Sequence, residues 1–166
     1  MLGVGILGAG YFGAFHARAI AAIPDIDIVA VCADELAPAE AFAAEHGGKP
    51  YGDWRAMLDD QSVDAIAITA PHHLHCPLAV AALEAGKHVL LEKPMALSVI
   101  ECSRIIASAE ASRRKLMVGQ IMHFVWPCLV AREILQRGEL GKPVMGRVAC
   151  RKSGWNRTAV AGISIP

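Results

Sequence analysis

The sequence has no excess of charge of either sign. Its 166 residues include 16 Lys and Arg against 16 Asp and Glu, so the formal net charge is zero. Such a chain has no electrostatic field that attracts nucleic acid or an anionic membrane surface. Apolar runs are also short, because none reaches the roughly 18 residues of a membrane-spanning helix. We therefore expect neither a nucleic-acid nor a membrane partner.

The cysteines are not spaced in pairs. Five cysteines are scattered along the chain without a C-x-x-C pair. An odd, scattered set does not form a disulfide framework and indicates a reducing compartment. The apolar residues 1–15 lack the basic start of a signal peptide and contain five glycines, so we do not interpret them as a targeting signal. The expected location is cytoplasmic.

What the sequence does contain is typical of a globular protein. Apolar residues make up 54% and charged residues 19%, and the length suits one domain of roughly 100–200 residues. Short apolar segments, which predict strands, alternate with longer segments of helical period. The expected strands cover residues 2–7, 26–32, 65–69, 88–92 and 116–119, and the expected helices cover 11–22, 38–46, 54–58, 74–85, 98–113 and 127–137.

Strands that are apolar throughout are buried on both faces, and helical crossovers between them make the sheet parallel. The pattern therefore predicts an α/β fold, a doubly wound parallel sheet of the Rossmann type, over residues 1–125. Residues 143–151 read as one more strand, followed by a polar segment and a short apolar tail. We expect only this first strand of a second α+β domain. Residues 126–166 are then a linking helix and the start of an incomplete C-terminal substrate and oligomerisation domain.

A glycine-rich motif follows the first expected strand. The G-x-G-x-x-G pattern predicts a tight turn, a close backbone approach to a pyrophosphate, and close packing of helix on strand. Free N–H groups at the start of the helix would face the anion. The expected cofactor contacts are Gly8, Ala9, Gly10, Tyr11, Phe12 and Gly13.

An acidic residue after the second strand would bind the ribose hydroxyls of NAD and repel the additional phosphate of NADP. Asp34 follows Gly13 by 21 residues, close to the usual interval, and no arginine follows it at once. NAD is therefore favoured over NADP. The alternative is that Asp34 and Glu35 only form a solvated loop.

Polar residues follow three other strands, at the edge where open α/β sheets bind ligands. The first set is Ala70, Pro71, His72 and His75, the second is Glu92, Lys93 and Pro94, and the third is Gln120 and His123. We expect the first two sets to contact the cofactor, with His72 and His75 beside the nicotinamide. His73 would face solvent, and Gln120 and His123 would face the substrate.

Two alternatives apply to these residues. Glu92 and Lys93 could form an ordinary surface pair. The histidines at positions 72, 73 and 75 could also suggest a metal-dependent hydrolase. Zinc sites, however, draw ligands from separate segments, and the isolated His123 is the only candidate for a ligand outside this cluster. We therefore expect no metal. Partial desolvation beside a cofactor would suit Lys93 to proton transfer.

Together these motifs resemble the Gfo/Idh/MocA family, the glucose–fructose oxidoreductase, inositol dehydrogenase and rhizopine-catabolism group. The resemblance runs from Leu2 to about Trp155. It rests on Gly8–Gly13 with His16 a turn later, Pro71-x-x-x-His75, Ala85-Gly86-Lys87-His88-Val89 leading to Glu92-Lys93-Pro94, and Gly138-Glu139-Leu140-Gly141-Lys142-Pro143. The resemblance implies that Lys93 is catalytic and that Glu92 and Pro94 contact the cofactor.

The resemblance also implies an activity. Such a protein is an NAD(P)-dependent oxidoreductase that moves hydride between nicotinamide C4 and a hydroxyl-bearing carbon of a sugar, cyclitol or dihydrodiol. His72 stands where the family often has Asn, as in members that act on cis-dihydrodiols. Family members are longer, and their second domain supplies a catalytic histidine and aspartate and commonly the homo-oligomer interface. We expect this fragment alone to be weak or inactive; the alternative is a non-catalytic dinucleotide sensor or partner-binding module.

Overall fold

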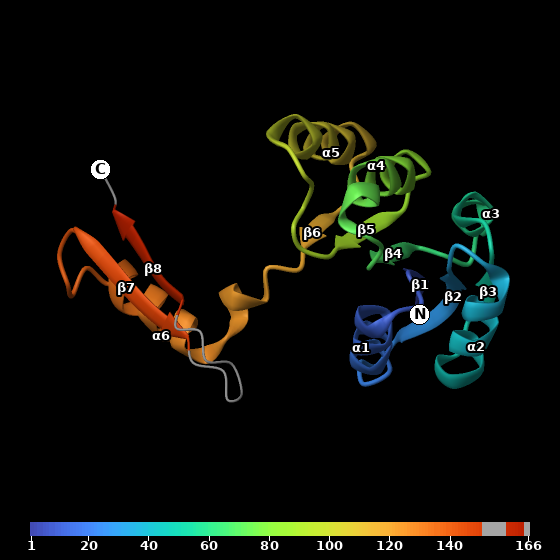
Figure 1. Cartoon of the computed structure of the whole chain (residues 1–166), viewed down its shortest axis with the longest axis horizontal. Helices are drawn as coiled ribbons and strands as arrows, with labels where there is room; N and C mark the ends of the chain where they lie inside the picture. Colours follow the sequence, from blue (N-terminus) through green and yellow to red (C-terminus); the bar gives the residue numbers. More distant parts are fainter. Residues whose placement is uncertain (151–158, 165–166) are drawn as a thin grey trace. The chain divides into compact units, whose positions relative to one another are not determined.

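The computed structural model describes residues 1–150 and 159–164. The chain divides into two compact units, Met1–Gln120 and Ile121–Pro166 (Figure 1). This division falls slightly before the boundary expected after residue 125, because the short helical turn that follows Gln120 makes its contacts with the second unit.

The first unit contains a six-stranded sheet, and all of its strand pairs are parallel. The strand order is β3-β2-β1-β4-β5-β6, so the chain winds outward from β1 in one direction and from β4 in the other. This confirms the doubly wound α/β fold. The strands are β1 Leu2–Leu7, β2 Ile26–Cys32, β3 Lys49–Tyr51, β4 Ala65–Ile68, β5 His88–Leu91 and β6 Leu116–Val118.

Helices cover both faces of this sheet (Figure 1). They are α1 Tyr11–Ile20, α2 Leu36–His46, α3 Trp54–Asp59, α4 His75–Glu84 and α5 Val99–Ser112, with a 3-10 turn η1 at His72–Leu74. One core cluster joins α1 and α2 to the sheet through residues such as Ile20 and Phe42. The other joins α3, α4 and α5 to it through residues such as Met57, Leu83 and Ile105.

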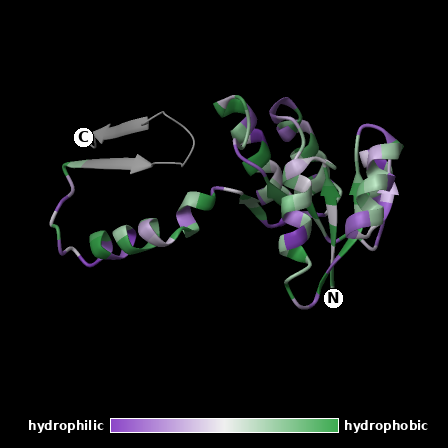
Figure 2. Cartoon of the chain, turned by 60° about the horizontal axis from the view of Figure 1, so that its bottom comes forward, coloured by the Kyte–Doolittle hydropathy of each residue, from purple (hydrophilic) through white to green (hydrophobic). Residues whose placement is uncertain are grey.

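The sequence explains these layers. The apolar strand residues supply both clusters, so hydrophobic colouring follows the strands of the first unit (Figure 2). The Ser98 hydroxyl caps α5 by accepting a hydrogen bond from the Glu101 amide at 3.2 Å, and the Glu101 carboxylate accepts one from the Leu97 amide. This pair is similar to a capping box, except that the Glu101 carboxylate binds the amide of the residue before the N-cap and not that of Ser98 itself.

The second unit contains a 3-10 turn η2, Ile121–Phe124, helix α6, Trp126–Gln136, and strands β7, Met145–Cys150, and β8, Ala159–Ser164. Figure 2 shows hydrophobic and hydrophilic residues along α6. The two strands pair antiparallel, so the expectation of a single strand in this unit is wrong. Small residues and Gly162 give β8 a low strand propensity, which is why its sequence read as an apolar tail. Residue 151, the expected end of β7, and Trp155 lie outside the described residues.

Among the helices that the structure describes, none is long and apolar enough to cross a bilayer.

Candidate functional site

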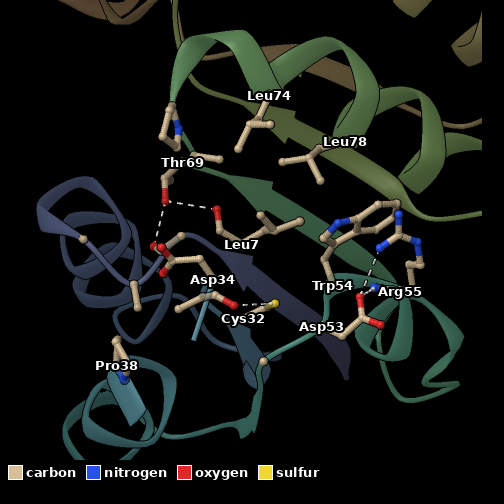
Figure 3. A pocket seen from close by; sticks show the side chains of 17 residues that line it. Leu7, Cys32, Asp34, Pro38, Asp53, Trp54, Arg55, Thr69, Leu74 and Leu78 are labelled. Atoms are coloured by element: carbon tan, nitrogen blue, oxygen red, sulfur yellow. Dashed lines mark hydrogen bonds and ion pairs between the residues drawn. The ribbon is translucent and has the colours of Figure 1, made fainter. Parts of the chain in front are cut away.

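Two of the three motif glycines are required by the protein itself. Gly8 has φ of +120°, and a Cβ there would lie 2.5 Å from Thr69 Oγ1. The Thr69 hydroxyl instead donates a hydrogen bond to the Gly8 carbonyl at 2.9 Å (Figure 3). A Cβ on Gly13 would lie 2.1 Å from the Gly8 carbonyl oxygen. These positions therefore permit the turn and the close packing of α1 on β1.

Gly10 differs from both. Its φ is −96°, which any residue can adopt, and a Cβ there would have no neighbour within 4 Å. No steric demand within the described residues explains a glycine at this position. Gly10 also precedes α1, whose first turn receives no hydrogen bond from a capping side chain. Open space beside free helix N–H groups fits the pyrophosphate of a dinucleotide.

A cavity of about 670 Å³ extends from this loop over the carboxyl ends of β1, β2 and β4. That volume is in the range of small-molecule and cofactor sites. Six of the expected cofactor contacts line it, namely Gly8, Ala9, Gly10, Asp34, Ala70 and Pro71. In Figure 3, Leu74 and Leu78 point into the cavity from the segment that starts α4, and Trp54 and Arg55 enter it from α3.

Sequence reasoning missed the α3 contribution. Asp53 caps α3 by accepting a hydrogen bond from the Arg55 amide at 3.0 Å, and the Arg55 guanidinium lies 3.5 Å from the same carboxylate. The guanidinium also stacks 4.2 Å from the Trp54 ring centroid. In the sequence, Asp53 before Trp54 and Arg55 indicates the start of a helix. This signal does not indicate which cavity the helix end borders.

The Asp34 end of the cavity is electronegative. Burial, followed by the charges of Asp53 and Asp34, raises the pKa of the Cys32 thiol to about 11. Cys32 is therefore an unreactive thiol at neutral pH. The cavity lining holds two carboxylates, Asp34 and Asp53, against the single guanidinium of Arg55.

Lys93 follows β5 and is exposed at the same edge of the sheet. Its Nζ lies 5.1 Å from the centroid of the Phe12 ring, within the range of a cation–π interaction. The Lys93 amide donates a hydrogen bond to Glu92 Oε2 at 3.1 Å. The structure therefore brings the Lys93 ammonium close to Phe12, an aromatic residue of the glycine motif.

Glu92 does not form the simple surface pair with the Lys93 ammonium. Its Oε1 instead lies 2.9 Å from Nε2 of His16, on α1, and both side chains are largely buried. A Cβ on Gly119 would lie 3.4 Å from the same carboxylate oxygen. Glu92 thus connects the phosphate-loop helix to the end of β5 and lies close to the start of the segment that contains Gln120.

His75 is not where the sequence placed it. It is 0% exposed and is not among the residues that line the cavity, although we expected it to border a nicotinamide pocket. Nδ1 lies 2.7 Å from the Pro94 carbonyl oxygen and Nε2 lies 2.9 Å from that of Ala70. A ring at the first position of α4 points inward beneath the two loops, which sequence spacing alone does not reveal.

His72 and His73 are both exposed and line one shallow cavity of about 590 Å³ with Ala70 and Pro71. His73 is exposed to solvent, as expected, and borders the same surface as His72 because both lie in the 3-10 turn η1. The residues that the structure describes contain no group of three or more His, Cys, Asp or Glu side chains that could hold a metal ion.

The two expected substrate-side residues fall in different units. Gln120 is exposed at the end of the first unit, and its amide donates to the Val118 carbonyl at 2.7 Å. His123 lies in η2 of the second unit. Their roles toward the substrate stay predictions.

The chain belongs to the Gfo/Idh/MocA family, described as an oxidoreductase family with an NAD-binding Rossmann fold, whose sequence profile matches residues 2–120. The first unit is therefore an NAD(P)-binding domain.

Two curated relatives illustrate the similarity. Inositol 2-dehydrogenase of Salmonella typhimurium is 32% identical over 148 residues, covering 87% of this chain and 44% of the relative. Inositol 2-dehydrogenase 1 of Saccharopolyspora erythraea is 36% identical over 86% of this chain and 43% of the relative. The chain thus spans less than half the length of these curated relatives.

Two solved structures are also similar to this chain. An NAD-binding oxidoreductase from Klebsiella pneumoniae is 36% identical with a TM-score of 0.80, covering 86% of this chain and 40% of that one. A 3-ketoreductase from Actinomadura kijaniata, solved with NADP and TDP-benzene, is 27% identical with a TM-score of 0.78, covering 88% of this chain and 46% of that one.

Proposed function

We propose that this chain is the nucleotide-binding portion of an NAD(P)-dependent oxidoreductase. The reaction would move hydride between nicotinamide and a hydroxyl-bearing carbon of a sugar, cyclitol or dihydrodiol. Relatives named as inositol dehydrogenases and a 3-ketoreductase support a substrate of this class. The proposal includes a cytoplasmic location, homo-oligomeric assembly, and the division into a dinucleotide-binding domain over residues 1–125 and a substrate and oligomerisation domain that begins at residue 126.

The observation that carries the proposal is the space at Gly10. Gly10 has ordinary backbone angles, and a Cβ there would meet no atom within 4 Å. Among the described residues, therefore, nothing explains why this position lacks a side chain. A dinucleotide supplies that reason, because its pyrophosphate would lie against this backbone and the start of α1. The Asp34 end of the cavity would then receive the adenosine ribose. Lys93, which follows β5 outside the cavity lining, would lie toward the nicotinamide.

Lys93 is the proposed catalytic residue. The bound dinucleotide would supply the hydride acceptor or donor. The Lys93 ammonium, exposed and lying 5.1 Å from the Phe12 ring centroid, would polarise the substrate hydroxyl and exchange its proton. Glu92 fixes the Lys93 amide at 3.1 Å, which leaves the side chain as the mobile part of this segment. His72, Pro71 and Pro94 would border the nicotinamide, and Gln120 and His123 the substrate.

NAD is the preferred cofactor in this proposal. An NADP 2′-phosphate would have to enter the part of the cavity that already contains the Asp34 and Asp53 carboxylates. Arg55 offsets only part of that charge, because it is held by Asp53 at 3.5 Å and stacked on Trp54. Like charges at short range disfavour binding.

Calorimetric titration of the chain with NAD and NADP tests the proposal. We expect binding of both, tighter for NAD. If neither nucleotide produced binding heat with the folded protein at millimolar concentration, the proposal would be overturned. Tighter binding of NADP would overturn the cofactor preference and leave the nucleotide-binding function intact.

A further inference from the structure

His75 is completely buried in a part of the molecule where most polar groups face solvent. Among the side chains that the structure describes, it and Lys87 are the buried polar or charged ones. A buried polar ring costs free energy unless its nitrogens are hydrogen-bonded. Both His75 nitrogens face carbonyl oxygens, with Nδ1 2.7 Å from that of Pro94 and Nε2 2.9 Å from that of Ala70. Because carbonyl oxygens only accept and a neutral imidazole carries one N–H, we assign that N–H to Nδ1, which has the shorter contact.

The two partners belong to different loops of the site. Ala70 follows β4 and lines the cavity beside Pro71. Pro94 follows β5 and comes directly after Lys93. Within the described part of the chain, no other side-chain hydrogen bond joins these loops. His75 therefore connects the loop that would border the nicotinamide with the segment that contains the lysine.

We propose that His75 is a positioning residue, which holds the Pro94 carbonyl and so fixes the direction in which Lys93 leaves the backbone. The inference rests on the proposed dinucleotide-binding function. The backbone is held on both sides of the lysine, by Glu92 Oε2 at the Lys93 amide and by His75 Nδ1 at the Pro94 carbonyl. The His75 ring itself touches neither cofactor nor substrate, because it is fully buried.

The two ring nitrogens offer a matched pair of variants. An Asn amide stands close to the position of Nδ1, and a Gln amide close to that of Nε2. Both amides donate N–H bonds to carbonyl oxygens. H75N therefore keeps an N–H donor for the Pro94 carbonyl, whereas H75Q presents its N–H to the Ala70 carbonyl and leaves the Pro94 carbonyl without a donor from this position. Each variant, like the ring, donates to one of the two carbonyls, so the two variants should have similar stabilities.

The test titrates each variant of this chain with NAD and with ADP-ribose, which lacks the nicotinamide. H75Q is expected to weaken NAD binding about tenfold relative to ADP-ribose, and H75N to leave that ratio near the wild-type value. Equal ratios for the two variants would overturn the inference. A wild-type chain that binds neither ligand would instead overturn the proposed function.

A measurement on the unaltered chain covers the case in which both variants unfold. With ¹⁵N-labelled histidine, the Nδ1 resonance of His75 is expected to differ between the NAD-bound and ADP-ribose-bound states, because only NAD engages the Lys93 end of the cleft. Identical His75 ring resonances in the two bound states would contradict a positioning role.

Discussion

The two edges of the central sheet use polar residues in opposite ways. At the amino edge, the buried Lys87 ammonium donates to the carbonyls of Asp60 and Val63 at 2.9 and 2.8 Å. The Asp64 carboxylate accepts from the Gly3 amide, and His88 Nδ1 accepts from the Lys115 amide. These side chains form their hydrogen bonds with backbone groups of the fold itself.

At the carboxyl edge, several polar groups keep binding capacity. Asp34 and Lys93 are exposed, and Gly10 leaves open space before α1. Side chains that have satisfied their hydrogen bonds internally stabilise the fold, while exposed groups around a cavity remain free for a ligand. Polar side chains at the amino edge thus stabilise the fold, while the exposed groups at the carboxyl edge are available to a ligand. Open α/β sheets in general bind ligands at the carboxyl edge.

The largest expected effect separates two glycines of one motif. Gly13→Ala forces a Cβ to 2.1 Å from the Gly8 carbonyl oxygen and should lower the free energy of unfolding by about 3 kcal/mol. Gly10→Ala has room for its Cβ and should change stability by less than about 0.5 kcal/mol, yet weaken NAD binding at least about tenfold. Urea denaturation and calorimetry measure both effects. Unchanged NAD affinity in Gly10→Ala would remove the proposed reason for that glycine.

At the amino edge, we expect a large loss of stability without a loss of NAD affinity. Lys87→Met removes both hydrogen bonds of the Lys87 ammonium, and although the Asp60 carbonyl keeps one from the Val63 amide, the buried Val63 carbonyl loses this donor. The change should cost about 2 kcal/mol of unfolding free energy. NAD affinity of the folded variant should match wild type, because Lys87 lies at the opposite edge. Lys115→Met, at an exposed lysine, is the control and should leave stability unchanged. Weaker NAD binding by folded Lys87→Met would break the division between the edges.

A smaller effect is expected in cofactor choice. Asp34→Asn removes one of two carboxylates that line the ribose end of the cavity. NADP affinity should rise about tenfold relative to NAD. Glu35→Gln is the matched control, since the neighbouring Glu35 is exposed and does not line the cavity. Equal shifts in both variants would mean that general charge, and not the position of Asp34, sets the preference.

The smallest expected effect depends on pH at the amino edge. Hydrogen bonds, first from the Tyr51 hydroxyl and then from Ser62, lower the pKa of Asp60 from 3.8 to about 2. A lowered folded-state pKa stabilises the protein above the unfolded value, and this stabilisation is lost as pH falls from 3.8 toward 2. Asp60→Asn should therefore be less stable than wild type at pH 6, with the difference vanishing near pH 2. A difference independent of pH would exclude this origin.

The sequence predicts the sheet better than its surroundings. Uniformly apolar strands and the glycine motif are local signals, so β1, β2, β4, β5 and β6 were expected close to their observed positions. The strand Lys49–Tyr51 was missed, because three residues with a central proline carry little strand signal. The strand Ala159–Ser164 was missed for its small residues and glycine.

The site follows the same rule. The glycine loop, Asp34 and Lys93 could be assigned from their position after strands, since parallel strands end at one edge. Trp54 and Arg55 could not, because only the folded chain brings the start of α3 beside Asp34. His75 was misplaced because the direction of a side chain at a helix start depends on packing, which here turns its ring under the Pro94 carbonyl.

The central claim is that the carboxyl edge binds a dinucleotide. It is tested most directly by following backbone amide resonances of the ¹⁵N-labelled chain during titration with NAD. The account predicts saturable shifts at Gly8, Gly10 and Gly13 and beside Asp34, with the amides of Asp64 and Lys87 unmoved. Shifts centred on the amino edge, or none at saturating NAD, would contradict it.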